Sequence, residues 1–316
     1  MRTAADARTH VRTALVTGAA GFIGCHLTER LVADGWMVRG IDDERTGDWG
    51  RVKVPVDRID RSLEEMSPAE LRTACAGVDV LFHLAAEKHN TPGRTAERTV
   101  AVNIAATARL FDAAGAESIR RVVFASSLYA YGSLGPAPMA EADLPAPRTV
   151  YGVSKLAGEH LLRVVETSHG MSWSVARLFF IYGPRQLAAG GYPSVIVRNF
   201  GRIRRGEQPV VNGDGRQALD YVFVEDCIEG LLRLAESDQQ GITVNVASGR
   251  AVSVEDLTAQ MIDIAGSSLE PIAGPSDWTA GTSRSGTTTL ASERLGWEAS
   301  TSLEVGLRRV WESMSA

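Results

Sequence analysis

The sequence lacks the features that mark several large classes of protein. It has three cysteines, Cys25, Cys75 and Cys227, and no two of them stand in a Cys-x-x-Cys spacing. This excludes a disulfide-stapled scaffold and a cysteine-based zinc site, because both need clustered cysteines. The histidines show no ligand spacing, so we expect no metal. No stretch approaches the roughly 18 consecutive apolar residues of a membrane-spanning helix.

Positive charge is also in short supply. The net charge is −5 and the sequence pI is about 5.8, so the chain lacks the basic footprint of a nucleic-acid-binding protein. Residues 1–12 are polar and contain no apolar run of the kind that forms a signal peptide. We therefore expect a cytoplasmic protein that binds neither nucleic acid nor a membrane.

What the chain does contain is a regular alternation of apolar runs and helical patterns. The apolar runs are continuous, as in parallel strands that are covered on both faces. They lie at Ala14–Thr17, Met37–Ile41, Val78–Leu84, Val122–Ser126 and Ser174–Phe180, and helical patterns fall at about 22–34, 65–76, 99–117 and 151–168. This alternation predicts an α/β fold with a Rossmann-type, doubly wound parallel sheet.

A glycine-rich segment between the first strand and the first helix predicts a dinucleotide site. It reads Thr17-Gly18-Ala19-Ala20-Gly21-Phe22-Ile23-Gly24. Gly18 and Gly21 allow a tight turn and a close approach of the backbone to a pyrophosphate, and Gly24 lets the helix pack on the sheet. Phe22 and Ile23 open the helix, whose free N–H groups and dipole favour phosphate.

An acidic pair at the end of the second strand predicts the choice of cofactor. Asp42 lies 18 residues after Gly24, close to the spacing at which an acid accepts hydrogen bonds from the adenosine ribose. Asp42 and Asp43 together would repel a 2′-phosphate, which favours NAD over NADP. Arg45 is the one nearby cation.

Three further residues predict acid–base chemistry. Tyr151 and Lys155 are spaced i, i+4 and so share one face of a helix. A lysine ammonium beside a phenol favours the phenolate, which makes the tyrosine a usable acid/base. Ser127 follows the strand that ends at Ser126, and parallel strands present such residues at the edge where ligands bind.

At this point the sequence resembles the extended short-chain dehydrogenase/reductase family, in its nucleotide-sugar epimerase and dehydratase branch. The resemblance runs from about residue 12 to 312. It rests on the glycine segment, His83-Leu84-Ala85-Ala86, Asn103, Ser126-Ser127, Tyr131-Gly132, Tyr151 to Lys155, Tyr182-Gly183-Pro184, Gly213-Asp214-Gly215, Val224-Glu225-Asp226 and Leu295-Gly296-Trp297.

The resemblance implies roles for these positions. Tyr151 would take the proton from a sugar hydroxyl, Lys155 would hold the nicotinamide ribose, and Ser127 would hydrogen-bond the reacting oxygen. The residues expected to bind NAD are Gly18, Gly21, Phe22, Ile23, Gly24, Asp42, Asp43, Asp57 near the adenine, Leu84, Ala85, Ala86, Asn103, Tyr151 and Lys155. The substrate would be a nucleotide sugar, with NAD tightly bound and two chains joined as a homodimer through a four-helix bundle.

The resemblance also implies two domains. Residues 1–180, with a returning segment at about 219–246, would form the NAD-binding Rossmann domain. Residues 181–218 and 247–316 would form a smaller, mixed α/β substrate-binding domain.

The sequence departs from the branch at positions that contact the substrate. Leu128 and Tyr129 follow Ser127 where dehydratases carry a carboxylate. Tyr129 is a pocket-wall aromatic, a substrate contact or an unusual acid/base. Leu219 stands where an arginine usually grips the pyrophosphate, with Arg216 and Arg284 as candidates to replace it. The residues expected to bind substrate are Lys88, Ser127, Tyr129, Phe180, Arg185, Arg216 and Arg284.

Because elimination of water needs that missing carboxylate and epimerisation does not, we expect an isomerase. It would invert a sugar at C4 through a transient 4-keto sugar and regenerate NAD in each cycle. The alternatives are a 4,6-dehydratase, a ketoreductase, and a catalytically silent NAD-sensing regulator.

Overall fold

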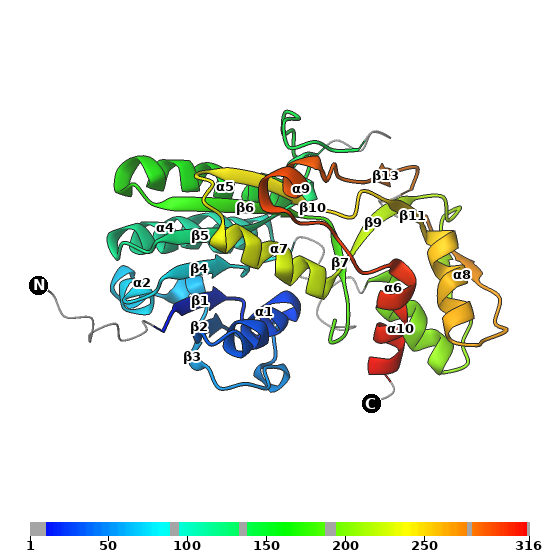
Figure 1. Cartoon of the computed structure of the whole chain (residues 1–316). Coiled ribbons are helices and arrows are strands. Elements are labelled where there is room, and N and C mark those ends of the chain that lie inside the picture. The colour runs from blue at the N-terminus through cyan, green and yellow to red at the C-terminus, as the bar shows by residue number, and fades with distance from the viewer. Residues whose placement is uncertain (1–10, 89–94, 133–137, 187–193, 277–279, 315–316) are drawn as a thin grey trace, which may run out of the picture.

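The computed structural model describes residues 11–88, 95–132, 138–186, 194–276 and 280–314. Its centre is a seven-stranded parallel sheet in the order β10-β6-β5-β4-β1-β2-β3 (Figure 1). The strands are β1 (Thr13–Thr17), β2 (Met37–Asp42), β3 (Asp57–Asp60), β4 (Val80–His83), β5 (Arg121–Ser127), β6 (Ser172–Leu178) and β10 (Ile242–Val246). Since the strand order reverses between β1 and β4, a ligand crevice is expected outside the carboxyl ends of these strands.

Helices cover both faces of this sheet. On one face α1 packs against α7, and on the other α4 packs between α2 and α5 (Figure 1). These helices are α1 (Phe22–Ala33), α2 (Pro68–Cys75), α4 (Thr107–Ala116), α5 (Val150–His169) and α7 (Val224–Glu236). Each face encloses its own hydrophobic core, with Val16 and Leu231 in one and Leu110 and Phe124 in the other.

A smaller group of elements lies at the other end of the molecule, on the right in Figure 1. Its four-stranded sheet contains β7 (Phe180–Tyr182), β9 (Ala218–Phe223), β11 (Ala251–Ser253) and β13 (Ser283–Arg284), and β8 (Val210–Asn212) pairs with β12 (Ile272–Gly274). Its helices are α6 (Val195–Arg204), α8 (Val254–Ile264) and α10 (Leu303–Ser313). Phe200, Phe223, Leu257 and Leu307 form its core.

Short elements complete the described chain. α9 (Thr289–Leu295) packs on β10, and α3 (Ala96–Val100) continues through a π-helical segment, η3 (Ala101–Ala106), into α4. The single 3-10 turns are η1 (Trp49–Arg51), η2 (Leu63–Glu65) and η4 (Leu128–Ala130).

The predicted Rossmann-type sheet is confirmed, with two differences. β3 was not expected, because Asp57–Asp60 is largely exposed and has no apolar run. β9 lies in the smaller sheet, so the segment that returns to the large sheet begins with α7 rather than at residue 219.

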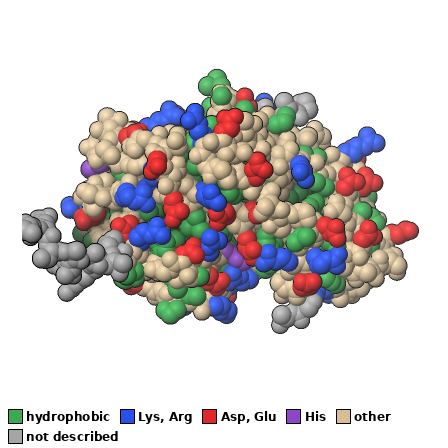
Figure 2. Space-filling model, viewed as in Figure 1, with side chains coloured by type: hydrophobic (Ala, Val, Ile, Leu, Met, Phe, Trp, Pro, Cys, Tyr) green, Lys and Arg blue, Asp and Glu red, His purple; other side chains and the backbone are tan. Residues whose placement is uncertain are grey.

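The face in view carries acidic and basic side chains interspersed with one another (Figure 2). None of the described helices is long and apolar enough to cross a membrane.

Candidate functional site

A cavity of about 520 Å³ lies at the carboxyl edge of the large sheet. It extends from Asp42 at the end of β2 to Ser127 at the end of β5, and its far wall includes Leu219 of β9. The cavity therefore joins the predicted dinucleotide site to the smaller group of elements.

The glycine segment forms one wall of the cavity with its backbone. Gly18 has φ +72°, and a Cβ there would lie 2.9 Å from the nitrogen of Ala85, whereas a Cβ on Gly24 would lie 1.9 Å from the oxygen of Gly18. Gly21 caps α1 without a side-chain hydrogen bond, so the first helical N–H groups of Phe22 and Ile23 stay available. All five residues line the cavity, and this cradle fits a pyrophosphate.

Asp42 lies where an adenosine ribose would be recognised. Its carboxylate is buried and accepts hydrogen bonds from the backbone nitrogens of Ala20 at 3.0 Å and Glu44 at 2.8 Å. Burial raises the pKa of Asp42, and these two hydrogen bonds oppose the rise. Asp42 and Asp43 both line the cavity, as expected, and the residues present fit NAD.

Asp57 is placed away from this site. It begins β3, at the amino end of the strand, and its exposed carboxylate pairs with Arg39 Nε at 2.9 Å. Because ligands bind at the carboxyl ends of parallel strands, the expectation that Asp57 lies near the adenine is corrected. Ser62 and Leu63, which follow β3, line the cavity instead.

The three residues expected to carry the chemistry meet at the centre of the cavity. Ser127 ends β5, and Tyr151 and Lys155 lie on the first turns of α5, whose N-cap is Thr149. Lys155 is buried and donates to the backbone oxygen of Ala125 at 2.8 Å.

The environment shifts both titrating groups. Burial lowers the pKa of the Lys155 ammonium to about 7, and the charge of Lys88 acts in the same direction. Burial raises the pKa of the Tyr151 phenol, and a side-chain hydrogen bond with Ser127 opposes that rise. The shift of Tyr151 is opposite to that expected from the Tyr–Lys spacing. The reason is that the Tyr151 phenol is itself desolvated, and burial penalises its charged form.

Asn103 does not line the cavity; it fixes the cavity's surroundings. It lies in η3, is buried, and its Oδ1 accepts from the nitrogen of Glu87 at 2.7 Å. Its Nδ2 donates to the oxygen of Glu87 at 2.9 Å and to Ser154 Oγ at 3.0 Å. Asn103 therefore ties the segment after β4 to the helix that carries Lys155.

The side chains expected to bind substrate separate into two groups. Lys88, Tyr129 and Phe180 line the cavity, as do Leu84, Ala85 and Ala86 of the expected cofactor set. Tyr129 packs edge-on against Tyr151, with 5.8 Å between ring centres.

The three arginines do not line the cavity. Arg185 has φ +64° and directs its guanidinium to Glu29, at 2.7 and 2.9 Å, on the far side of α1. Arg216 is exposed in the turn before β9. Arg284 is buried beside Leu219 in the β9–β13 register, and its guanidinium lies 5.9 Å from the centre of the Tyr129 ring.

Several residues at the cavity were not found from the sequence. They come from segments without a recognisable motif, namely the turns after β2 and β3, the helix α3 and the smaller group of elements. They include Thr46, Arg61, Ser62, Leu63, Arg98, Gln186, Ser194, Arg198, Asn212, Gln217 and Tyr221.

His83 is a core residue, and not part of the chemistry. It is buried, and its ring nitrogens contact Thr17 Oγ1 at 2.7 Å and Thr107 Oγ1 at 2.9 Å. Burial lowers its pKa to about 3, so the imidazole is neutral. Within the described ranges, no group of three or more His, Cys, Asp or Glu residues is placed to hold a metal ion.

Comparison with known proteins identifies relatives of this chain in sequence and in fold. A family model described as the NAD dependent epimerase/dehydratase family matches residues 14–247. An uncharacterized UDP-glucose epimerase, YtcB of Bacillus subtilis, is 34% identical over 93% of this chain and 95% of its own length.

Two solved structures share the fold over nearly the whole chain. UDP-glucose 4-epimerase of Thermotoga maritima, solved with UDP-glucose, has a TM-score of 0.89 at 27% identity and covers 96% of this chain and 98% of its own. MoeE5, solved with UDP-glucuronic acid and NAD, has a TM-score of 0.85 at 31% identity and covers 96% of this chain and 99% of its own.

Proposed function

Because the chain belongs to the NAD-dependent epimerase/dehydratase family, we propose that it is a nucleotide-sugar 4-epimerase that works through a transient 4-keto sugar. The observation that carries this choice is the loop after β5. Ser127 is followed by Leu128 and Tyr129, so neither of the two positions directly after it supplies a carboxylate to eliminate water. Ser127, Tyr151 and Lys155, which suffice for hydride-mediated inversion, all line one cavity.

The proposed chemistry divides among these three residues. Tyr151 takes the proton of the sugar C4 hydroxyl and returns it at the end of the cycle. Ser127 hydrogen-bonds the reacting oxygen, and Lys155 holds the nicotinamide ribose. When bound, NAD accepts and returns the C4 hydride, and its positively charged nicotinamide ring favours the Tyr151 phenolate.

We propose a UDP-sugar as substrate. Support comes from the UDP-glucose and UDP-glucuronic acid bound in two structural relatives. Leu219 stands where an arginine usually grips the pyrophosphate. Arg284 lies opposite Leu219 in the β9–β13 register and is a candidate to replace that arginine. In this proposal the large sheet and its helices, including the returning α7 and β10, bind NAD, and residues 181–218 and 247–316 bind the sugar nucleotide.

Incubation with UDP-, dTDP-, GDP- and CDP-sugars, followed by mass spectrometry and NMR, tests the reaction type. We expect a C4 epimer of unchanged mass with no net NADH. A product lighter by one water would make the protein a dehydratase, and stoichiometric consumption of cofactor would make it a reductase.

We also propose a cytoplasmic homodimer. Val153 and Val164 lie three turns apart on α5 and are 47% and 59% exposed, so the helix presents an apolar stripe to solvent. A four-helix bundle formed by α4 and α5 of two chains would cover it. Light scattering on the purified protein should give the mass of two chains, and Val164→Asp should shift it towards one.

A further inference from the structure

An arginine lies close to the acids expected to recognise the adenosine ribose. Arg45 lines the cavity three residues after Asp42, in the turn that follows β2. A cation at this end of a dinucleotide site is the residue type that accommodates the 2′-phosphate of NADP. Arg45 taken alone would therefore weaken the selection of NAD.

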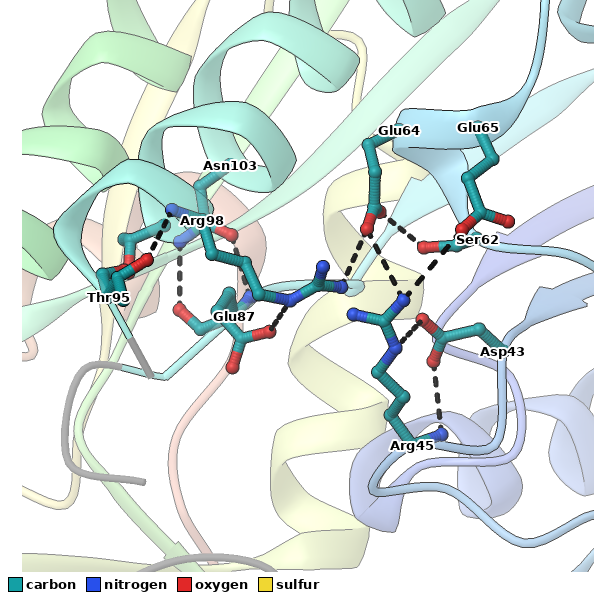
Figure 3. Close-up of polar contacts among 10 residues, drawn as sticks. Asp43, Arg45, Ser62, Glu64, Glu65, Glu87, Thr95, Arg98 and Asn103 are labelled. Atoms are coloured by element: carbon teal, nitrogen blue, oxygen red, sulfur yellow. Dashed lines mark hydrogen bonds and ion pairs between the residues drawn. The ribbon is translucent and has the colours of Figure 1, made fainter. Parts of the chain in front are cut away.

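The structure shows that Arg45 is already engaged by carboxylates. Its Nε lies 3.3 Å from Asp43 Oδ2, and its Nη2 lies 3.5 Å from Glu64 Oε1 (Figure 3). Glu65 approaches the same Nη2 at 4.0 Å. Three acids therefore face one guanidinium, and its positive charge is already balanced by carboxylates of the protein.

Glu64 is the most firmly held of these acids. Its side chain is 16% exposed, and its Oε1 also contacts Arg98 Nη2 at 2.6 Å. Its Oε2 accepts a hydrogen bond from Ser62 Oγ (Figure 3). Arg98 in turn pairs with Glu87, through an Nε to Oε2 contact of 3.0 Å. Glu64 thus links the turn after β3 to both Arg45 and Arg98.

The other arginines at this end of the cavity are paired too. Arg98 divides its guanidinium between Glu64 and Glu87, as described above. Arg61 pairs with Glu70 at 3.2 Å and donates to the backbone oxygen of Glu65. Each arginine that lines this end therefore has a carboxylate partner.

From these contacts we infer that Glu64 is a determinant of cofactor choice. It holds the Arg45 guanidinium and adds negative charge. A 2′-phosphate would therefore be repelled by carboxylates and would find Arg45 already paired. This selection adds to that by Asp42 and does not depend on which sugar is converted, so it goes beyond the proposed reaction. Charge-assisted pairs are the strong class of hydrogen bond, and a phosphate can compete for Arg45 only if its partner is weakened.

The test is a competition between the two dinucleotides for the full-length protein. Wild type and variants are equilibrated with NAD and NADP at equal concentrations, both in excess over the protein. Unbound dinucleotide is then removed on a desalting column. The bound dinucleotides are then released by denaturation and quantified by mass spectrometry. The variants are Glu64→Gln, the double variant Glu64→Gln with Arg45→Gln, and Glu117→Gln as the control. Glu117 forms an ion pair with Arg72 at 2.9 Å, and Arg72, unlike Arg45, does not line the cavity.

The inference predicts that Glu64→Gln raises the bound NADP-to-NAD ratio about tenfold, a change of ~1.4 kcal/mol. Glu117→Gln should leave the ratio at the wild-type value, and the double variant should lose most of the gain. Thermal unfolding checks that the variants are folded. An unchanged ratio in Glu64→Gln would overturn the inference, and so would a gain that persists without Arg45.

Discussion

A buried ion pair lies next to the proposed catalytic residues on α5. Glu159 lies one turn after Lys155 on α5, and Arg177 lies on β6. Arg177 Nε donates to Glu159 Oε1 at 3.0 Å and its Nη2 donates to Oε2 at 2.7 Å, while Ser126 Oγ donates to Oε1 at 2.5 Å. The two side chains are 5% and 7% exposed. The pair therefore pins α5, with Tyr151 and Lys155, to the strands β5 and β6.

Glu159→Leu should remove about 3–5 kcal/mol from the free energy of unfolding. It leaves the Arg177 guanidinium buried without its counter-charge, and breaking a buried pair at one partner costs about this much. The double variant Glu159→Leu with Arg177→Met should recover part of the loss, because it removes the uncompensated charge.

Urea unfolding at pH 7 in saturating NAD measures these energies. The control is Glu304→Gln, which breaks an exposed i, i+4 pair with Arg308 at 3.2 Å and should cost less than about 0.5 kcal/mol. If Glu159→Leu costs no more than this control, the pair does not hold the catalytic helix in place.

Three further predictions concern the cavity. Tyr151→Phe should lower turnover by roughly 10²–10⁴, the usual contribution of a positioned acid/base. NAD binding measured by fluorescence should stay near the wild-type value, and near-normal turnover would assign the proton transfer to another group. Wild type should bind NAD at least tenfold more tightly than NADP, about 1.4 kcal/mol, because Asp42 and Asp43 face the ribose; equal affinities would contradict this. Gly24→Ala should abolish NAD retention after purification, since the new Cβ would lie 1.9 Å from the oxygen of Gly18. A variant that copurifies with NAD would show that the glycine segment can shift to admit the methyl group.

Elements with a continuous apolar run were predictable from the sequence. β1, β4 and β5 are buried along nearly their whole length, so their apolar sequences were enough to predict central strands of the sheet. β3 escaped prediction because its residues are largely exposed and the strand forms by pairing with β2. The error at Asp57 followed directly, since the position of an acid along an unrecognised strand cannot be read from composition.

The residues of the cavity also divide into those that could be predicted from the sequence and those that could not. Ser127, Tyr151 and Lys155 line one cavity, as predicted, because the end of a buried strand and an i, i+4 pair on a helix can both be recognised in the sequence. The three arginines expected at the substrate do not line the cavity, because a sequence gives the charge of a long side chain and not its direction. Arg185 turns to Glu29, and Arg284 is buried beside Leu219, 5.9 Å from the centre of the Tyr129 ring. The raised pKa of Tyr151 depends on burial depth, which helical spacing does not report.

The proposed inversion at C4 by hydride transfer can be tested by following the C4 hydrogen. UDP-glucose and UDP-glucuronic acid carrying deuterium at C4 are incubated with the enzyme, and the products are examined by NMR and mass spectrometry. We predict that at least one gives a C4 epimer that keeps its deuterium at C4 and its full mass. Loss of the deuterium to water, loss of one water from the product, or the absence of a C4 epimer from both substrates would contradict it.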